Sequence, residues 1–501
     1  MLLHFILREY AADDAYIHLR IAENFYNYGL PYYNLSAPVN GSSSNLWIFI
    51  LIALHALPFD SIMLLSLLNG LLLTLLMFKV HEILDNKIYT LIAVSPFYAI
   101  TFQQMESNLA CLLLFWGFER IISKKPYALF FFTLAACTRL EFTVILIAYT
   151  SYLLLKDRKN ILKELALSAI PAAIVLAYNL YYFHAIFPHT VQAKSIVYSI
   201  NHELFTEQFS KMISVDPYFF YRKFHFFALL AAFLYSFRFF NKNKLINLSL
   251  LLTSGGAAIL AVFYLKGVMI FPWYLAVVFG PLVLGLLFIS RQASSPLLLA
   301  FSFFACFPFL KAMFFNIESA SGNAAHYADY LRSARTRQYL AVGSVFNNIC
   351  PECSLMAPEI GGLGQTFKGK IVDAVGLITP EALAFHPLPV PQARFSGSVG
   401  AVPARFVESA RPDLIISLGL FLKDFRNSHV CSKYQAVLVR PFVKEDDKNL
   451  TGQVLWGSEA LIVLLNKEEF TEQMITGIAS LLKENSEDVK IDFNCKSPPL
   501  T

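Results

Sequence analysis

Two adjacent aspartates near the amino terminus are the first residues whose types could carry chemistry. Asp13 and Asp14 open a stretch with helical periodicity, which puts Asp13, Arg20 and Asn24 near one face and Asp14 and His18 on the neighbouring face. A carboxylate there can accept a proton from an attacking hydroxyl, or hold a divalent cation that bridges phosphate oxygens. The alternative is that one aspartate caps the helix and both are merely solvated.

A third carboxylate, Glu106, lies in the very short loop 103–107 between two apolar segments. This position puts Glu106 at or slightly within a membrane boundary, where an unpaired carboxylate is costly unless it meets a partner or water. The alternative is an ordinary residue at the end of a helix.

Arg139 and Glu141 interrupt a run that is otherwise apolar from residue 127 to residue 155. Charges at membrane depth are expensive and usually face a polar cavity, so this pair is a site candidate. Arg139 could form two parallel hydrogen bonds to a phosphate, a geometry that lysine cannot supply. The alternative is a structural pair between Arg139 and Glu141.

The segment 186–194 follows a long apolar span and carries two cationic side chains. We expect Pro188 to stop the preceding helix. Lys194 is well placed to meet an anionic headgroup, and His189 could donate to a phosphate or transfer a proton. The alternative for Lys194 is that it snorkels to the interface.

The composition identifies the solvent that surrounds these residues. Of 501 residues, 56% are hydrophobic and only 15% are charged, which is typical of a membrane protein. Apolar stretches recur up to about Phe315, and a polar tail follows. The net charge of +5 is small and the Lys and Arg residues fall in short loops, so nucleic acid is not an expected partner.

We expect ten apolar spans between the amino terminus and the tail. They run over about 61–80, 88–102, 107–122, 126–137, 140–155, 161–187, 223–240, 244–264, 268–289 and 295–316. Basic loops mark the cytoplasmic side, and the basic ones are 79–87, 119–125, 156–163, 238–244 and 290–292. The segment 46–57 is too short to cross, so we interpret it as re-entrant or interfacial.

The remaining loops then share the outer side. They are 8–60, 103–107, 138–141, 187–222 and the tail after about 317. Four groups of carboxylates and cations on one face suggest a shared polar cavity. The chemistry that fits is displacement of an anionic leaving group, in which cations stabilise a departing phosphate and an aspartate activates the acceptor hydroxyl.

Both ends of the chain add expectations. The seven residues Met1 to Leu7 are too few for the inside-to-outside span of about 20 expected there, and they do not resemble a signal peptide. We therefore expect the natural start to lie further upstream. The tail predicts a mixed α/β domain, with a polar amphipathic stretch over 324–340, apolar runs over 370–375, 413–418, 434–439 and 460–465, and a last helix over 468–483.

Two motifs of the tail are interpreted as structural. The run Gly361-Gly362-Leu363-Gly364 lacks the full fingerprint of a nucleotide site, and we predict a tight turn. Cys350, Cys353, Cys431 and Cys495 could form up to two disulfides in an oxidising compartment, with three pairings open. A second metal-like pair does not follow Cys350 and Cys353, so zinc is not expected.

These residues resemble the membrane glycosyltransferases of the C superfamily, in particular the bacterial branch that includes the mycobacterial terminal arabinofuranosyltransferase. The first outer loop of that family is similar to Asp13-Asp14-Ala15-Tyr16-Ile17 with Arg20, Asn24, Gly29, Tyr33-Asn34 and Val39-Asn40-Gly41 through Leu46-Trp47. Further motifs follow in order: Gln104-Met105-Glu106 resembles Gly-Met-Glu, Thr138-Arg139-Leu140-Glu141 resembles Thr-Arg-Pro-Glu, Phe187-Pro188-His189-Thr190 with Lys194 resembles Leu-Pro-Asn-Thr with lysine, and Asp373-Ala374-Val375-Gly376-Leu377 resembles Asp-x-x-Gly-Leu.

The resemblance implies an inverting enzyme whose donor is a polyprenyl-phosphate sugar and whose acceptor is an envelope glycan, lipid or protein. It implies Asp13, Asp14 and Glu106 as catalytic residues, Arg20, Arg139, Lys194 and His189 as contacts of the donor phosphate, and Glu141 and Asp373 as contacts of the substrate. A divalent cation, Mg or Mn, would be held by Asp13 and Asp14, and no nucleotide cofactor is implied.

The fold class expected is therefore an α-helical polytopic membrane bundle of the C-superfamily type, with about eleven spans including a truncated first one, and a C-terminal extracytoplasmic α/β domain. The membrane domain would cover 1–316 with the outer loop 8–60, and the soluble domain 317–501. We expect it in the lipid bilayer of a bacterial inner membrane. Alternative functions are a multi-spanning lipid or sugar transporter or flippase, and a structural membrane protein whose charges only hold the bundle together.

Overall fold

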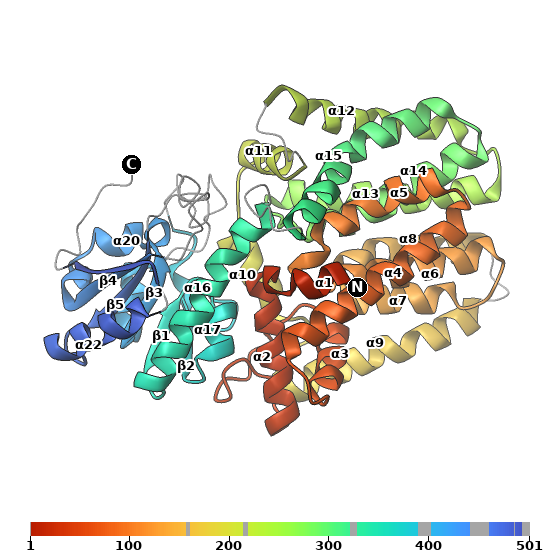
Figure 1. Ribbon diagram of the computed structural model, residues 1–501. Helices are drawn as coiled ribbons and strands as arrows, with labels where there is room; N and C mark the ends of the chain where they lie inside the picture. Colours follow the sequence, from red (N-terminus) through yellow and green to blue (C-terminus); the bar gives the residue numbers. More distant parts are fainter. Residues whose placement is uncertain are drawn as a thin grey trace. The chain divides into compact units, whose positions relative to one another are not determined.

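The computed structural model describes residues 2–156, 161–213, 219–320, 328–388, 402–440, 460–484 and 486–492. The chain divides into two compact units (Figure 1). Unit 1 comprises Met1–Arg8, Ser43–Ile186 and Asn201–Asn323, and unit 2 comprises Glu9–Ser42, Phe187–Ile200 and Ala324–Thr501. The predicted boundary near residue 316 therefore lies close to the observed one, but parts of the two predicted outer loops 8–60 and 187–222 fold with the tail.

Unit 1 is helical over its described residues. Its α-helices are α1 (Leu2–Ile6), α3 (Asn45–His55), α4 (Ser61–Leu84), α5 (Lys87–Ile100), α6 (Ser107–Ile122), α7 (Ala128–Thr138), α8 (Thr143–Lys156), α9 (Ile161–Phe183), α11 (His202–Ile213), α12 (Phe219–Ser236), α13 (Lys244–Lys266), α14 (Tyr274–Gln292) and α15 (Pro296–Ala320). Short 3₁₀ turns are η1 (Arg8–Tyr10), at the boundary of the two units, η2 (Thr101–Gln103), η3 (Leu140–Phe142) and η4 (Phe237–Phe239). All ten predicted apolar segments are confirmed as helical.

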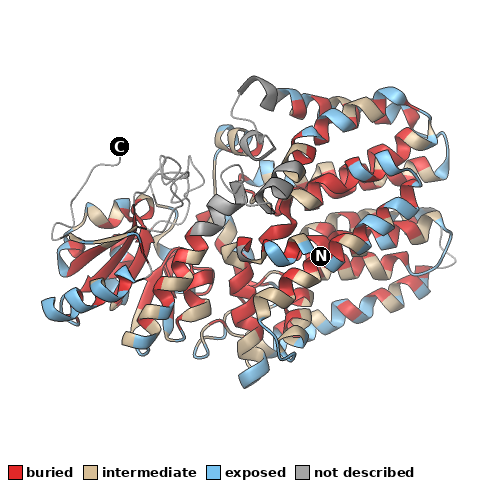
Figure 2. Cartoon of the chain, viewed as in Figure 1, coloured by how far each residue is buried: buried red, intermediate tan, exposed pale blue. Residues whose placement is uncertain are grey.

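Five of the described helices are long and apolar enough to cross a membrane: α4, α9, α13, α14 and the segment Pro296–Met313 of α15. Large apolar side chains also lie on the outside of unit 1, such as Phe78, which is 63% exposed, and Ile174, which is 55% exposed (Figure 2). Soluble proteins rarely expose apolar surface on this scale. Both observations indicate a membrane protein.

Local sequence explains where several of these helices begin. Asp60, Asn86 and Asn243 precede α4, α5 and α13, and each side chain accepts hydrogen bonds from backbone N–H groups of the first turn. α14 is the central helix, because every residue from Tyr274 to Ser290 is buried. Gly285 of α14 approaches α13 so closely that a Cβ atom would lie 2.1 Å from Thr253 Oγ1.

Basic loops predicted on one side do meet at one end of the helices. Glu119 at the end of α6 lies 3.8 Å from Lys79 at the end of α4 and 3.2 Å from Lys125. Arg291 at the end of α14 contacts Asp85 after α4 at 2.9 Å. Three of the five predicted basic loops, 79–87, 119–125 and 290–292, therefore lie at the same end of these helices.

Unit 2 contains a six-stranded mixed sheet in the order β2-β1-β3-β5-β4-β6. Its strands are β1 (Ser354–Ala357), β2 (Lys370–Asp373), β3 (Leu414–Leu418), β4 (Tyr434–Arg440), β5 (Leu461–Asn466) and β6 (Asp488–Asp492). β1 is parallel to β2 and β3, whereas the pairs β3–β5, β5–β4 and β4–β6 are antiparallel. The predicted runs near 370, 413, 434 and 460 are all confirmed as strands.

Helices complete unit 2. They are α2 (Asp13–Tyr28), α10 (His189–Val197), α16 (Ala328–Ile349), α17 (Gly361–Thr366), α19 (Ala404–Ala410), α20 (Lys423–Arg426) and α22 (Glu472–Lys483), with 3₁₀ turns η6 (Pro380–Phe385), η7 (Gly419–Leu422) and η8 (His429–Lys433). One face of the sheet, through Ile415, Ala436 and Ile462, packs against Phe406 and Phe425 of α19 and α20. α22 contacts β4, β6 and α16 (Figure 1).

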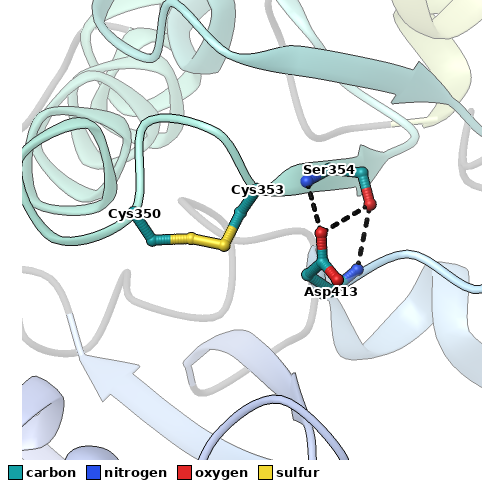
Figure 3. The surroundings of a disulfide bond; sticks show 4 residues. All are labelled: Cys350, Cys353, Ser354 and Asp413. Atoms are coloured by element: carbon teal, nitrogen blue, oxygen red, sulfur yellow. Dashed lines mark hydrogen bonds between the residues drawn. A yellow bond between two sulfur atoms is a disulfide. The ribbon is translucent and has the colours of Figure 1, made fainter.

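Two details of the structure differ from the sequence predictions, and a third decides a disulfide pairing that the sequence left open. The run Gly361–Gly364 is the first turn of helix α17, so the predicted tight turn is wrong. Helix α9 ends at Phe183, and Pro188 instead precedes α10, so Pro188 does not stop α9. Of the three open pairings, the structure has the one that joins Cys350 to Cys353, where α16 leads into β1 (Figure 3).

The same figure shows how that turn is held. Asp413 Oδ2 accepts hydrogen bonds from the backbone N–H of Ser354 at 2.7 Å and from its hydroxyl at 2.9 Å (Figure 3). Cys431 is disulfide-bonded too, and Cys495 lies outside the described residues.

Candidate functional site

Asp13 is a helix cap that connects the first outer loop to the tail. Its two carboxylate oxygens accept the backbone N–H groups of Gly361 and Gly362, each at 2.8 Å. These are the first N–H groups of α17, where a negative charge also meets the positive end of the helix dipole. Asp13 therefore performs a capping task, although the helix it caps is α17 and not its own.

Arg20 caps the other end of the same short helix. Its guanidinium donates to the carbonyl oxygens of Gly364 and Phe367, each at 2.7 Å, and to those of Tyr33 and Gly369 at 2.9 and 3.1 Å. It is 4% exposed and stacks on the Tyr33 ring. The predicted contact of Arg20 with a donor phosphate is not supported by this geometry, because backbone carbonyls already occupy the guanidinium.

The spacing of Asp13 and Arg20 explains why one helix can cap both ends of another. Seven residues along α2 correspond to roughly 10 Å, which matches the length of the six-residue helix α17. The glycines of α17 allow the close approach, since a Cβ at Gly361 would lie 1.7 Å from the carbonyl oxygen of Asp13. A Cβ at Gly364 would lie equally close to the Tyr33 hydroxyl. The glycine run is thus a packing feature.

Replacing Asp13 by alanine should loosen α17 without unfolding the protein. Loss of an N-cap carboxylate costs about 0.5–2 kcal/mol, so amide hydrogen exchange in a peptide spanning 359–367 is expected to become faster. Exchange in the β4–β5 hairpin should stay unchanged. Unaltered protection of 359–367 would contradict the capping role. The matched control is Asp60→Ala, which removes the cap of α4 and should leave the protection of 359–367 unchanged.

A second group of charges lies beside the Asp13 cap. Glu359 accepts hydrogen bonds from Arg335 at 2.9 Å and from the Tyr339 hydroxyl at 3.0 Å. Burial, and then repulsion from Glu359, raises the pKa of Asp13 to about 6. Glu359 follows the carboxyl end of β1, a position that often carries functional residues, and this is the signal by which the sequence could have identified it.

Helix α10 brings the predicted cationic segment into unit 2. His189 Nε2 lies 2.9 Å from the carbonyl oxygen of Gly376, so this nitrogen carries the hydrogen. α10 also packs against η6 of the tail. Lys194 is half-buried one turn before Tyr198, so the two share a helix face.

Tyr198 is a residue that the sequence did not single out. It is 9% exposed, and its pKa is raised by burial and then by the nearby negative charges of Asp14, Asp373 and Glu359. Asp14 is itself half-buried at the start of α2, beside the capping residue Asp13. Unit 2 therefore gathers Asp14, Tyr198 and Lys194, which come from segments about 180 residues apart in sequence.

Asp373 lies at the end of β2 and organises a loop. Its oxygens accept the backbone N–H of Val375 at 2.8 Å and those of Leu377 and Ile378 at 2.5 and 3.1 Å. It is 1% exposed, and burial raises its pKa to about 6 although these hydrogen bonds act in the opposite direction. A direct substrate contact, predicted from the resemblance, is not supported by this position.

The raised pKa values predict that unit 2 loses stability as pH rises. Asp373 binds a proton more tightly in the folded state than in the unfolded state, so folding is favoured at low pH and weakened between about pH 4 and pH 6. Two pKa units correspond to roughly 3 kcal/mol at most. Hydrogen exchange of 371–379, corrected for the intrinsic pH dependence, should show lower protection at pH 7 than at pH 4.5.

The variant Asp373→Asn tests which group causes this slope. Because asparagine does not titrate, the change in protection of 371–379 between pH 4.5 and pH 7 should become smaller than in the wild type, with Asp13 contributing the remainder in the same direction. Protection that rises with pH in the wild type, or a slope that Asp373→Asn leaves intact, would contradict the assignment.

In unit 1 the structure brings Glu106, Arg139 and Glu141 into one cluster. Arg139 donates to Glu106 Oε1 at 2.6 Å and forms two parallel hydrogen bonds to Glu141 at 2.9 and 3.1 Å. Its guanidinium also lies 4.2 Å from the centre of the Tyr274 ring, and Ser44 donates to Glu106 at 2.9 Å. Glu106 and the Arg139 side chain are 1% and 3% exposed.

This cluster carries one positive and two negative charges, so its balance does not favour an anion. The predicted structural pair between Arg139 and Glu141 is present, and Glu106 joins it. A contact of Arg139 with a donor phosphate stays a prediction, because both carboxylates compete for the same guanidinium. The cluster does connect the two predicted loops 103–107 and 138–141. Ser44, the residue before α3, joins it through its hydrogen bond to Glu106.

The predicted site residues thus form two groups, one in each unit. Unit 2 holds Asp13, Asp14, Arg20, His189, Lys194 and Asp373, and unit 1 holds Glu106, Arg139 and Glu141. Within the described parts of the chain, three or more His, Cys, Asp or Glu side chains do not come together as a metal site. Convergence of the two groups in one pocket stays a prediction.

Comparisons of the chain with protein-family models, with curated proteins and with solved structures found no match.

Proposed function

We propose that the protein is an inverting membrane glycosyltransferase, which moves a sugar from a polyprenyl-phosphate carrier to a glycan, lipid or protein acceptor outside the cytoplasm. One observation supports this proposal most. The segments 9–42 and 187–200, which the charge of the loops predicts on the same side of the membrane as the tail, fold together with it in unit 2.

In the proposed reaction Asp14 accepts the proton of the acceptor hydroxyl as its oxygen attacks the anomeric carbon. The bond between that carbon and the phosphate oxygen breaks, and the lipid phosphate leaves with the electron pair. Lys194 stabilises the developing negative charge. A contact of His189 with the phosphate would require a hydrogen on Nδ1, because Nε2–H already donates to the Gly376 carbonyl. Asp14 is preferred to Asp13 as the base, because Asp13 already accepts two backbone N–H groups.

A divalent cation, Mg or Mn, remains part of the proposal in a reduced form. Asp14 and Glu359 both lie near Tyr198 and could help to hold a cation there. Glu359 would have to exchange its hydrogen bonds from Arg335 and Tyr339 for the cation. Asp13 and Asp373 would likewise have to exchange those from backbone N–H groups. Such a cation would neutralise charge on the phosphate oxygens.

The test is sugar transfer by washed membranes that contain the protein. Polyprenyl-phosphate donors with isotopically labelled sugars are supplied, and mass spectrometry compares envelope glycans with and without the protein. A new labelled glycosidic product supports the proposal. Movement of the intact lipid-linked sugar across the bilayer, with no labelled product from any donor, would instead establish the transporter or flippase alternative.

A further inference from the structure

A group of uncharged polar side chains lies inside unit 1, away from the residues assigned above. We call it the inner polar cluster, and its members come from α1, α4, η2 and α6 and the loop between them. They are His4, Ser66, Asn69, Thr101, Gln104 and Asn108. Each is at least 97% buried, which is expensive for polar groups in a bundle that faces lipid.

Direct hydrogen bonds join five members of the inner polar cluster, whereas the amide nitrogen of Asn69 donates to the Leu65 carbonyl one turn earlier in α4. The amide nitrogen of Gln104 donates to Ser66 Oγ at 3.0 Å, and Ser66 donates to the backbone carbonyl of His4 at 2.6 Å. Asn108 donates to Thr101 Oγ1 at 2.7 Å, and that hydroxyl lies 3.3 Å from His4 Nε2. Three helices and a 3₁₀ turn therefore meet in one network.

The hydroxyl of Thr101 can serve His4 Nε2 in either direction. Thr101 Oγ1 accepts from Asn108 and keeps a second lone pair and a hydrogen, so it either donates to Nε2 or accepts from it. In a neutral ring, Nδ1 is correspondingly a donor or an acceptor.

Four buried atoms of the inner polar cluster have no hydrogen-bond partner among the described residues. They are His4 Nδ1, whose role depends on the tautomer, and three acceptors, the side-chain oxygens of Asn69, Gln104 and Asn108. Buried polar groups in native proteins are almost always satisfied by protein or by ordered water. Four exceptions within the inner polar cluster therefore indicate a bound species.

We infer that the inner polar cluster binds ordered water. A water molecule donates twice and accepts, so two water molecules can serve the three acceptors together with His4 Nδ1 in either of its roles. A monovalent cation would suit the three oxygens, but the cluster contributes no carboxylate to balance its charge. An apolar ligand would satisfy none of the four atoms.

Bound water here would position the loop that carries Glu106. Gln104 has a positive φ of 60°, a conformation that residues other than glycine seldom adopt, and its side chain is bonded into the inner polar cluster. Water that bridges Gln104 to Asn69 or Asn108 would hold this conformation in place. The inference is independent of the proposed transferase activity.

A double-mutant cycle on the full-length protein in detergent tests the inference. Asn69 and Gln104 share no direct hydrogen bond, so Asn69→Leu and Gln104→Leu are each expected to lower the melting temperature by a few degrees, and the double variant by clearly less than the sum. Leu72→Met, a volume-conserving change of a buried residue one turn further along α4, is the control and should change little.

Three outcomes would overturn the inference. Single variants that melt higher than the wild type would indicate a dry site from which a penalty has been removed. Additive shifts would exclude a shared water, and a melting temperature that rises when sodium chloride replaces choline chloride would indicate a cation. If the variants fail to fold, an electron-density map of the wild type at better than roughly 2.5 Å resolution tests the inference instead. The map must show water density within hydrogen-bond distance of the Gln104 and Asn108 side chains. The absence of such density overturns the inference.

Discussion

Asp14→Asn is expected to lower sugar transfer by about 10²–10⁴-fold while the protein still folds, because asparagine cannot accept the proton of the acceptor hydroxyl. Asp14 is half-buried on the first turn of α2, and the carboxylate that caps α17 belongs to Asp13. Transfer is compared per folded molecule, with thermal unfolding in detergent as the measure of folding. Initial rates of labelled-sugar transfer in washed membranes measure the loss.

Two controls make this result specific. Asp60→Asn changes an aspartate into an equally good N-cap for α4 and should retain full transfer. Asp13→Asn should reduce the protection of α17 against hydrogen exchange more than it reduces transfer per folded molecule. Full transfer by Asp14→Asn would remove the proposed base, and a loss caused only by Asp13→Asn would return that role to Asp13.

The helical part of the fold could be predicted because its signals are local. Apolar segments of sufficient length, preceded by capping residues such as Asp60 and Asn86, specify a helix without reference to the rest of the chain. The ends of α6, Ser107 and Ile122, coincide with the predicted ones. The number of membrane crossings is harder, because helices such as α3 are too short for their length to decide.

Two strands of the sheet lacked a readable local signal. β1 is the four-residue segment Ser354–Ala357, and its composition is not typical of a strand. β6, Asp488–Asp492, lies at the sheet edge and alternates polar and apolar residues as a strand does, but with only Val489 and Ile491 apolar the alternation is too short to decide. Both become strands because of their neighbours, since β1 lies between β2 and β3 and β6 pairs with β4.

The roles of the candidate site residues could not be predicted from the sequence for a different reason. The helix-face argument correctly placed Asp13 with Arg20, but the same residue types serve catalysis and capping equally well. What decides for Asp13 is a partner, Gly361, that lies 348 residues away in sequence. No local pattern contains that contact, and glycines that allow two backbones to approach look in sequence like glycines of a turn.

Arg139→Met is expected to destabilise the protein by about 3–5 kcal/mol, because it leaves a buried carboxylate without its charged partner. Glu106 is 1% exposed and receives its 2.6 Å hydrogen bond from Arg139, whereas Glu141 is 18% exposed and can turn toward water. Thermal unfolding in detergent measures the loss. Arg139→Lys should be intermediate, since lysine cannot form the parallel bonds to Glu141.

A double variant separates a structural cluster from a phosphate site. In Arg139→Met with Glu106→Gln the unpaired buried charge is removed, so a good part of the lost stability should return. If Arg139 serves the fold alone, transfer activity per folded molecule should return as well. Recovered stability without activity, with full activity in the single variant Glu106→Gln, would mean that the guanidinium leaves its carboxylates during the reaction and meets the donor phosphate. An Arg139→Met protein as stable as the wild type would mean that the cluster does not hold unit 1 together.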